Sequence, residues 1–145
     1  MSKRISIKEI EPEAYKAMMA LENYVKSIGL DPKLKELIKI RASQMNGCDY
    51  CIDMHTEMAI KAGENEARIS SLSAWKESDS FSEEEKIALQ LTEEMTFISN
   101  GGVTDVTYDR AVSFFGGKVT AQLIMVIVLI NSWNRIMVTT KEVYK

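Results

Sequence analysis

Apolar residues recur every three or four positions along most of this chain, and no segment shows the alternation of apolar and polar residues that is typical of a strand. This spacing places the apolar side chains on one face of an α-helix, so the pattern predicts an all-α protein. With 145 residues the chain is long enough to enclose one hydrophobic core, and we expect a single domain over residues 1–145.

Capping residues and glycines divide this pattern into a bundle of about six or seven helices. Pro12 and Pro32 each stand at the start of an apolar pattern, where proline is favoured. Ser82 and Glu85 match a capping box, in which the two side chains satisfy backbone N–H groups reciprocally. The predicted helices cover residues 12–28, 32–45, 48–63, 67–75, 83–95, 104 or 107 to 115, and 118–138.

Charge and hydropathy argue against nucleic-acid and membrane partners. The net charge is −3, and lysines and arginines are scattered among acidic residues rather than forming a basic stripe. The N-terminal segment has no apolar run of the kind found in a signal peptide. The longest apolar run, Leu123–Ile130, has eight residues, whereas a membrane helix needs about 20. We therefore predict a cytoplasmic protein without nucleic-acid or membrane partners.

The two cysteines of the chain, Cys48 and Cys51, are separated by only two residues. A pair this close cannot connect distant parts of a fold, and disulfide frameworks are typical of short secreted chains with several pairs. In a cytoplasmic protein a local pair indicates thiol redox chemistry or metal binding.

On a helix, Cys48, Cys51 and His55 share one face, because they are three and then four positions apart. The two Cα atoms would lie about 5 Å apart, within the range that a disulfide tolerates. The first turn of a helix favours negative charge and hence the reactive thiolate. His55, one turn after Cys51, can accept the thiol proton or stabilise the thiolate.

Two further interpretations of the histidine and of Glu36 remain open from the residues alone. His55, the sole histidine, could instead be a buried core residue bonded to a backbone carbonyl. If the helices on either side of Asn46-Gly47 pack antiparallel, Glu36 could meet His55 directly or through a water and fix its tautomer. Glu36 could equally be a solvated residue among neighbouring lysines.

A zinc site is the competing chemistry for this cluster. Cys48, Cys51 and His55 supply three potential ligands, with Glu36 or Asp49 as a fourth. Structural zinc sites usually take a second Cys/His pair from elsewhere, and the chain contains none, so we predict neither a metal nor a cofactor. Near the other end of the chain Trp133, Asn134 and Arg135 could line a pocket or contribute to packing.

The spacing from Glu36 through Cys48 and Cys51 to His55 resembles the E-x11-C-x2-C-x3-H motif of the alkylhydroperoxidase AhpD-like proteins, in the carboxymuconolactone decarboxylase superfamily. The resemblance covers about residues 10 to 140. It implies an all-helical fold, trimers or hexamers, and a thiol-dependent peroxidase cycle. It also implies that Cys51 attacks the hydroperoxide, that Cys48 resolves the product as a disulfide, and that Glu36 and His55 relay protons.

The same resemblance implies an electron donor with a dithiol, either a protein or a lipoyl group. Tyr50 departs from the best-studied branch, which has histidine at that position; tyrosine, with an ordinary pKa of about 10, is no base at neutral pH. Decarboxylases of the superfamily lack the CxxC, so that activity is disfavoured. The remaining alternative to a peroxidase is a dithiol redox sensor or adaptor without significant turnover.

We predict a homo-oligomer, because Leu123–Ile130 is apolar around its whole circumference and the resemblance favours a homotrimer or homohexamer. Light scattering at micromolar concentration is expected to return a multiple of the chain mass of 16.4 kDa. A single-chain mass at that concentration would contradict the prediction.

Overall fold

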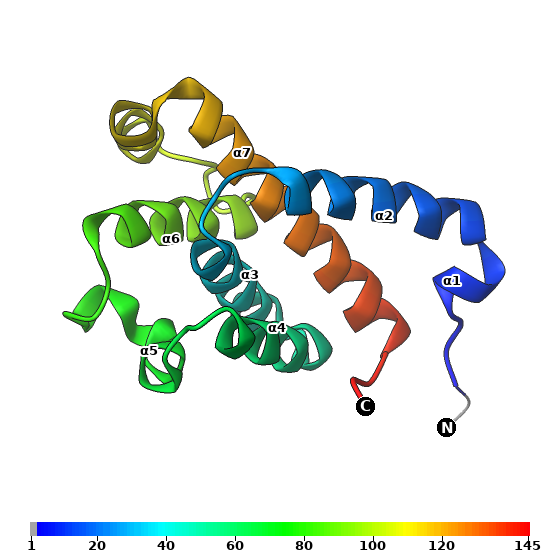
Figure 1. The fold of residues 1–145 in the computed structure, drawn as a ribbon. Helices are drawn as coiled ribbons and strands as arrows, with labels where there is room; N and C mark the ends of the chain where they lie inside the picture. Colours follow the sequence, from blue (N-terminus) through cyan, green and yellow to red (C-terminus); the bar gives the residue numbers. More distant parts are fainter. Residues whose placement is uncertain (1–2) are drawn as a thin grey trace.

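Helices make up all the regular structure of the computed structural model, which describes residues 3–145 (Figure 1). The prediction of an all-α fold is therefore confirmed. In chain order the elements are α1 (Ile7–Ile10), α2 (Pro12–Ser27), α3 (Pro32–Asn46), α4 (Asp49–Lys61), α5 (Glu66–Ser70), the 3₁₀-helix η1 (Leu72–Glu77), α6 (Glu83–Thr96) and α7 (Asp105–Thr140).

Local capping residues set most helix starts where the sequence predicted them. The Asp31 carboxylate accepts from the Lys33 N–H at 2.9 Å at the start of α3. Both hydrogen bonds of the capping box between Ser82 and Glu85 are formed at the start of α6. The sequence analysis missed α1, because its four residues are too few to show a helical period.

The predicted helix over residues 67–75 is wrong as a single element. The structure divides this segment into α5 and η1, with a non-helical backbone at Ala74. Leu72 and Trp75 are both buried, and residues three apart eclipse one another in a 3₁₀-helix. The tighter turn therefore directs both side chains into the core.

A break at Gly116 divides α7 where the sequence predicted two helices. Gly116 has φ 81° and ψ 169°, a backbone conformation that is open to glycine and strained for other residues. The second part continues to Thr140, two residues beyond the predicted end at Val138.

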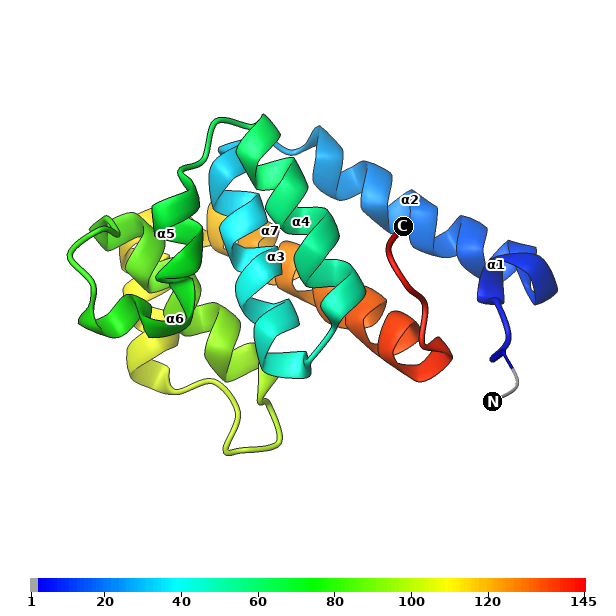
Figure 2. The same cartoon turned by 90° about the horizontal axis from the view of Figure 1, so that it is seen from below.

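Helix α3 lies between two hydrophobic clusters and touches most of the other helices (Figure 2). One cluster is formed with α2, α6 and α7, and the other with α4, α5, η1 and α6. As a result α3 is buried on several sides, and four of its polar residues are buried with it, namely Lys35, Glu36, Lys39 and Ser43. Charged side chains are seldom buried without partners, so these residues require an explanation.

The protomer itself covers most of the apolar run Leu123–Ile130. Five of its eight residues are buried, whereas Val128 is 36% exposed. The run is therefore not the uncovered surface that the sequence suggested, and the predicted oligomer rests on the family resemblance. Among residues 3–145, α7 is also the one helix that is long and apolar enough to cross a membrane by length and composition, with a mean hydropathy of 1.8 over 18 residues. That is weak support for a membrane span, because core helices pass the same test.

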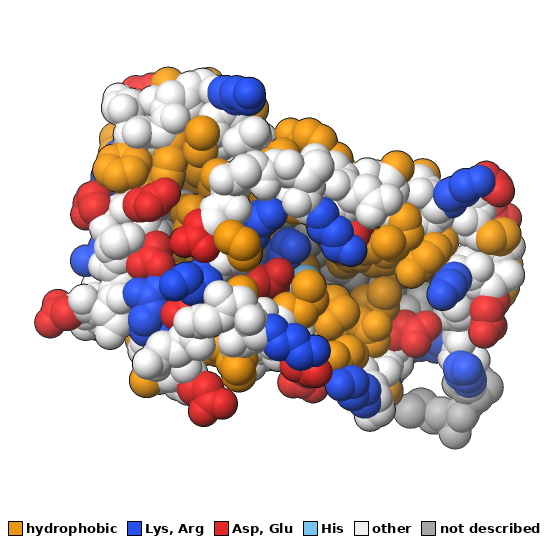
Figure 3. Space-filling view, in the orientation of Figure 1, with side chains coloured by type: hydrophobic (Ala, Val, Ile, Leu, Met, Phe, Trp, Pro, Cys, Tyr) orange, Lys and Arg blue, Asp and Glu red, His pale blue; other side chains and the backbone are white. Residues whose placement is uncertain are grey.

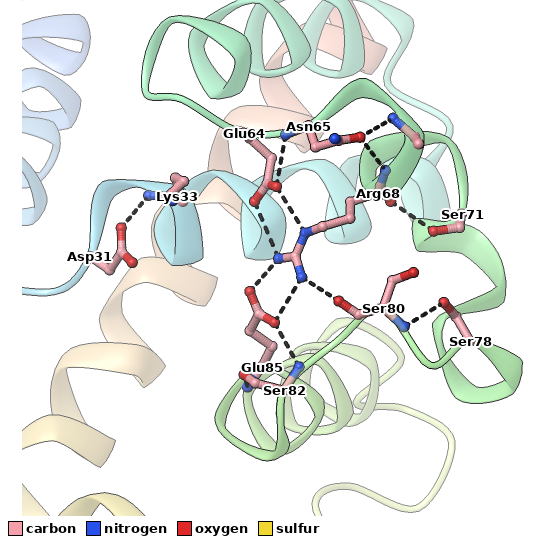
Figure 4. A network of polar contacts seen from close by, with 11 residues as sticks. Asp31, Lys33, Glu64, Asn65, Arg68, Ser71, Ser78, Ser80, Ser82 and Glu85 are labelled. Carbon is pink, nitrogen blue, oxygen red and sulfur yellow. Dashed lines mark hydrogen bonds and ion pairs between the residues drawn. The ribbon is translucent and has the colours of Figure 1, made fainter.

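Arg68 holds α5 against the start of α6 (Figure 4). Its guanidinium donates to Glu64 at 2.9 Å, to the Ser80 carbonyl and to Glu85, and it lies 4.9 Å from the Phe81 ring centre. Burial raises the pKa of Glu85, but hydrogen bonds from Arg68 and Ser82 outweigh burial and leave that pKa below its ordinary value of 4.5.

Replacing Arg68 with methionine is expected to lower the free energy of unfolding by about 1–3 kcal/mol, because it leaves two partly buried carboxylates without their partner. Urea unfolding measures the change. Folding lowers the pKa of the Glu85 carboxyl, so its ionised form stabilises the fold at any pH above the pKa of the unfolded chain. This stabilisation is lost as the pH falls through the lower pKa of the folded protein. The difference in the free energy of unfolding between wild type and Arg68→Met is therefore expected to become smaller as the pH falls below 4.5.

Arg110→Met is the matched control, because Arg110 pairs with Glu83 at the surface, where both side chains are about half exposed. Its effect is expected to stay within about 0.5 kcal/mol. Equal effects of the two substitutions would show that the Arg68 contacts do not hold α5 and α6 together.

Candidate functional site

A tight turn at Gly47 reverses the chain between α3 and α4. Gly47 has φ 66°, in the left-handed region that favours glycine. The next residue, Cys48, donates its backbone N–H to the Ser43 carbonyl at 3.0 Å and so fixes the exit from α3. The two helices consequently run antiparallel and side by side, as the sequence analysis supposed (Figure 2).

Cys48 and Cys51 form a disulfide at the beginning of α4. Their Cα atoms are 5.3 Å apart, which agrees with the helical estimate. Cys48 is the N-cap of α4 rather than part of its first turn, and its Sγ accepts from the Cys51 N–H at 3.3 Å. Both side chains are buried, so solvent reaches the sulfur atoms only through cavities.

Glu36 and His55 meet directly between the two helices. The distance from His55 Nδ1 to Glu36 Oε2 is 2.7 Å, and the residues are 3% and 7% exposed respectively. An ionised carboxylate only accepts, so Nδ1 donates and Nε2 is left for another partner. The structure thus selects the direct contact from the alternatives left open for Glu36, and it brings together all four residues predicted for the site.

Lys39 is a member of this buried group that the sequence analysis missed. Its ammonium nitrogen lies 3.7 Å from Glu36 Oε1, and the residue is 5% exposed. The spacing of three residues from Glu36 was the available signal, because it places both side chains on one face of α3. Nearby, burial and then the charge of Lys39 lower the pKa of Lys35, which donates to the Val25 carbonyl at 3.2 Å.

A cavity of about 240 Å³ opens beside Cys51 and His55. Its walls are mostly apolar, and Figure 3 shows hydrophobic side chains gathered below α2 beside a group of charged residues. The lining comprises Tyr15, Met19, Glu22 and Lys26 of α2, Lys39 of α3, Tyr50, Cys51, Met54, His55 and Met58 of α4, and Trp133 and Met137 of α7. Such a site suits a small organic molecule with a polar reacting group.

Side-chain amides hold the turn before Cys48 against α7. The half-buried Asn46 side chain donates to Asn134 Oδ1 at 2.9 Å, and the buried Asn134 side chain donates to the Ser43 hydroxyl at 3.0 Å. Asn134 is therefore a packing residue, whereas its neighbour Trp133 lines the cavity. Neither role was decided by the sequence.

Among residues 3–145, no hydrogen bond joins Tyr50 to Glu36 or His55. Its ring centre is 5.4 Å from that of Tyr144, and its side chain lines the cavity beside Cys51. Glu36 and His55 already make the carboxylate–imidazole contact without it. Within residues 3–145 no group of three or more His, Cys, Asp and Glu residues is arranged to hold a metal ion.

The fold and this cluster define a class, namely an all-helical protein with a dithiol beside a carboxylate–histidine pair. The chain belongs to the carboxymuconolactone decarboxylase family, whose sequence model matches residues 12–94, and it is an AhpD-like member. The matched segment contains all four predicted site residues. The cysteine pair and the AhpD-like structural neighbours fit a redox role.

Relatives and solved structures extend this assignment. The uncharacterized protein YdfG of Bacillus subtilis is 49% identical, over 94% of this chain and 92% of its own length. A protein of unknown function from Agrobacterium tumefaciens, with a proposed assignment as the antioxidant defence protein AhpD, superposes with a TM-score of 0.95 at 37% identity over 99% of each chain. The debrominase Bmp8 shares the fold alone, with a TM-score of 0.82 and 18% identity over 92% of this chain and 72% of its own.

Replacing Glu36 with leucine is expected to release the His55 ring from a single tautomer, because the acceptor of its Nδ1–H is lost. His55 is the sole histidine, so ¹⁵N NMR of the neutral imidazole reports this directly. Wild type is expected to give one Nδ1-protonated ring, and Glu36→Leu a mixture of tautomers.

Lys39→Met is the control, because it leaves the hydrogen bond between Glu36 and His55 intact. Glu36→Gln retains an acceptor oxygen and is expected to change the spectrum less than leucine does. Identical spectra for wild type and Glu36→Leu would refute the contact.

Proposed function

We propose that this protein is a thiol-dependent peroxidase of the alkylhydroperoxidase type, which reduces organic hydroperoxides through the Cys48–Cys51 pair. The observation that carries the proposal is the buried hydrogen bond of 2.7 Å between Glu36 and His55, because His55 also lines the cavity that opens on Cys51. The assignment proposed for the Agrobacterium protein supports the same reaction class, and the cysteine pair of this AhpD-like chain fits a redox role.

In the oxidising half of the cycle the Cys51 thiolate attacks the terminal oxygen of the hydroperoxide. The O–O bond breaks, an alcohol leaves with the proton that His55 accepted from the Cys51 thiol, and Cys51 becomes a sulfenic acid. The Cys48 thiol then attacks the Cys51 sulfur, water leaves, and the disulfide forms. One hydroperoxide and two thiols thus give an alcohol, water and a disulfide.

Glu36 and Lys39 act through the histidine. Glu36 fixes the ring so that Nε2 is free to exchange a proton with the reacting atoms, and its charge stabilises the imidazolium that appears during the cycle. The ammonium group of Lys39 partly balances the buried carboxylate when the ring is neutral. This proton relay distinguishes a catalyst from a redox sensor, which needs only the disulfide.

The cycle closes when a dithiol reductant returns the pair to two thiols. A protein dithiol and a lipoyl group are both suitable donors, since each delivers two electrons and becomes a disulfide. The apolar walls beside Cys51 favour an organic hydroperoxide over hydrogen peroxide itself. We further propose a homotrimer or homohexamer in the cytoplasm as the working form.

The cysteine roles are tested by single substitutions. Cys51→Ser is expected to abolish peroxide reduction, because the nucleophile is lost. Cys48→Ser is expected to let the Cys51 sulfenic acid form and persist, since its resolving partner is absent. Glu36→Gln is expected to slow turnover by about 10²–10⁴-fold, the usual contribution of acid–base catalysis. Dimedone trapping with mass spectrometry and a peroxide-consumption assay measure these outcomes.

Two results would contradict the proposal in different ways. A sulfenic acid on Cys48 in Cys51→Ser, with activity retained, would reverse the two roles. A single stoichiometric oxidation, without turnover in the presence of excess dithiothreitol, would favour the redox sensor.

A further inference from the structure

A second cavity, of about 340 Å³, opens beside Cys48. Cys48 lines this cavity and does not line the one beside Cys51, while Cys51 and His55 line only the latter. Two residues, Tyr50 and Met137, belong to both linings and form the partition between them. The two cysteines of one disulfide therefore line separate cavities.

The C-terminal tail builds the outer wall of this second cavity. Beyond α7 the chain reverses at Lys141, in a left-handed conformation, and runs back beside α4 (Figure 2). The cavity is lined by four consecutive residues of the tail, Lys141 to Tyr144. The rest of the lining includes Gly47, Cys48, Asp49 and Asp53.

Side chains near the end of the tail fasten it to α4. The Tyr144 hydroxyl donates to Glu57 Oε2 at 2.7 Å, and Lys145 Nζ lies 3.2 Å from the same carboxylate. The Tyr144 ring meets Tyr50 edge-on, with the ring centres 5.4 Å apart. The hydrogen bond from Tyr144 lowers the pKa of Glu57 and raises that of Tyr144, which is the expected effect of a phenol donating to a carboxylate.

The chemistry of disulfide reduction assigns a role to this second entrance. A thiolate that attacks one sulfur expels the other, and the step is faster when the departing thiolate is stabilised. His55 lines the same cavity as Cys51 and can protonate that sulfur as it leaves, whereas the lining beside Cys48 contains Lys141 but no histidine. A lysine ammonium, with an ordinary pKa of about 10.4, gives up a proton near neutral pH less readily than an imidazolium does. Attack is therefore favoured at Cys48, from the cavity that the hydroperoxide does not use.

We propose that the reducing dithiol enters through the cavity beside Cys48. In this proposal the tail that Tyr144 and Glu57 hold against α4 controls the rate of reduction and leaves the rate of oxidation by the hydroperoxide unchanged. The reductant thiol loses its proton to solvent and its thiolate bonds to the Cys48 sulfur. The S–S bond breaks, and Cys51 departs and takes the proton that the His55 ring has accepted from solvent. The second thiol of the reductant then attacks the reductant's first sulfur, which is bonded to Cys48. This attack closes a disulfide within the reductant and releases Cys48 as a thiol. This inference deepens the proposed peroxidase function and rests on it for the physiological meaning of the second entrance.

The first test identifies the cysteine that is attacked. Protein oxidised with diamide is mixed with 2-mercaptoethanol, quenched at short times with iodoacetamide, and mapped by mass spectrometry. We expect the mercaptoethanol adduct on Cys48 and the alkyl group on Cys51. Oxidised protein unfolded in urea is the control and is expected to give adducts on both cysteines. An adduct mainly on Cys51 in the folded protein would overturn the proposal.

The second test loosens the tail. Tyr144→Phe removes the hydrogen bond to Glu57 but keeps the ring against Tyr50. Reduction of the disulfide by dithiothreitol is expected to become roughly tenfold faster, the effect of losing one hydrogen bond to a charged acceptor. Oxidation of the reduced protein by cumene hydroperoxide is expected to keep its rate. Tyr108→Phe, at an exposed tyrosine of α7, is the matched control and is expected to change neither rate.

An unchanged rate of reduction in Tyr144→Phe, or equal changes in both half-reactions, would show that the tail does not control this entrance. Both tests of reduction begin from the diamide-formed disulfide and need no peroxidase activity. Failure of cumene hydroperoxide to oxidise any of the proteins would therefore refute the proposed function, and it would leave the site of thiol attack and the effect of the tail on reduction as separate results.

Discussion

A carboxylate can be buried in a small helical protein only if other groups compensate its charge. The buried Glu36 is compensated by two such groups. His55 supplies a hydrogen bond of 2.7 Å, and Lys39 supplies a positive charge at 3.7 Å. The contact with His55 requires that α3 and α4 pack antiparallel in one register, which the reversal at Gly47 allows. The position of the disulfide follows from the same register, because it begins the helix that carries His55.

The fold by itself does not define the reaction. The debrominase Bmp8 shares this architecture at 16–18% identity. A helical scaffold therefore accommodates different chemistries, and the function must be argued from side chains. Here Cys51, and not Cys48, lines the same cavity as His55. This asymmetry separates the two cysteines in the same sense as the spacing of one helical turn between Cys51 and His55.

The features that depend on local sequence were predictable, and those that depend on tertiary contacts were not. The caps at Asp31 and Ser82 and the break at Gly116 act within one helical turn, so the sequence located them. The spacing of the cysteines and His55 likewise placed three site residues. The contact with Glu36 stayed open, because it depends on how two helices pack. The return of the C-terminal tail along α4 left no periodic signal in the sequence at all.

One sulfur atom serves two purposes at the start of α4. Cys48 Sγ closes the disulfide and also accepts the N–H of Cys51 as the helix cap. A serine hydroxyl is among the best caps, so the fold would accept serine at this position without difficulty. What the sulfur adds at this position is the disulfide and not the cap. A Cys48→Ser substitution would therefore keep the start of α4 and leave Cys51 without a disulfide partner, so that the exchange of one atom separates the chemistry of the pair from the stability of the fold.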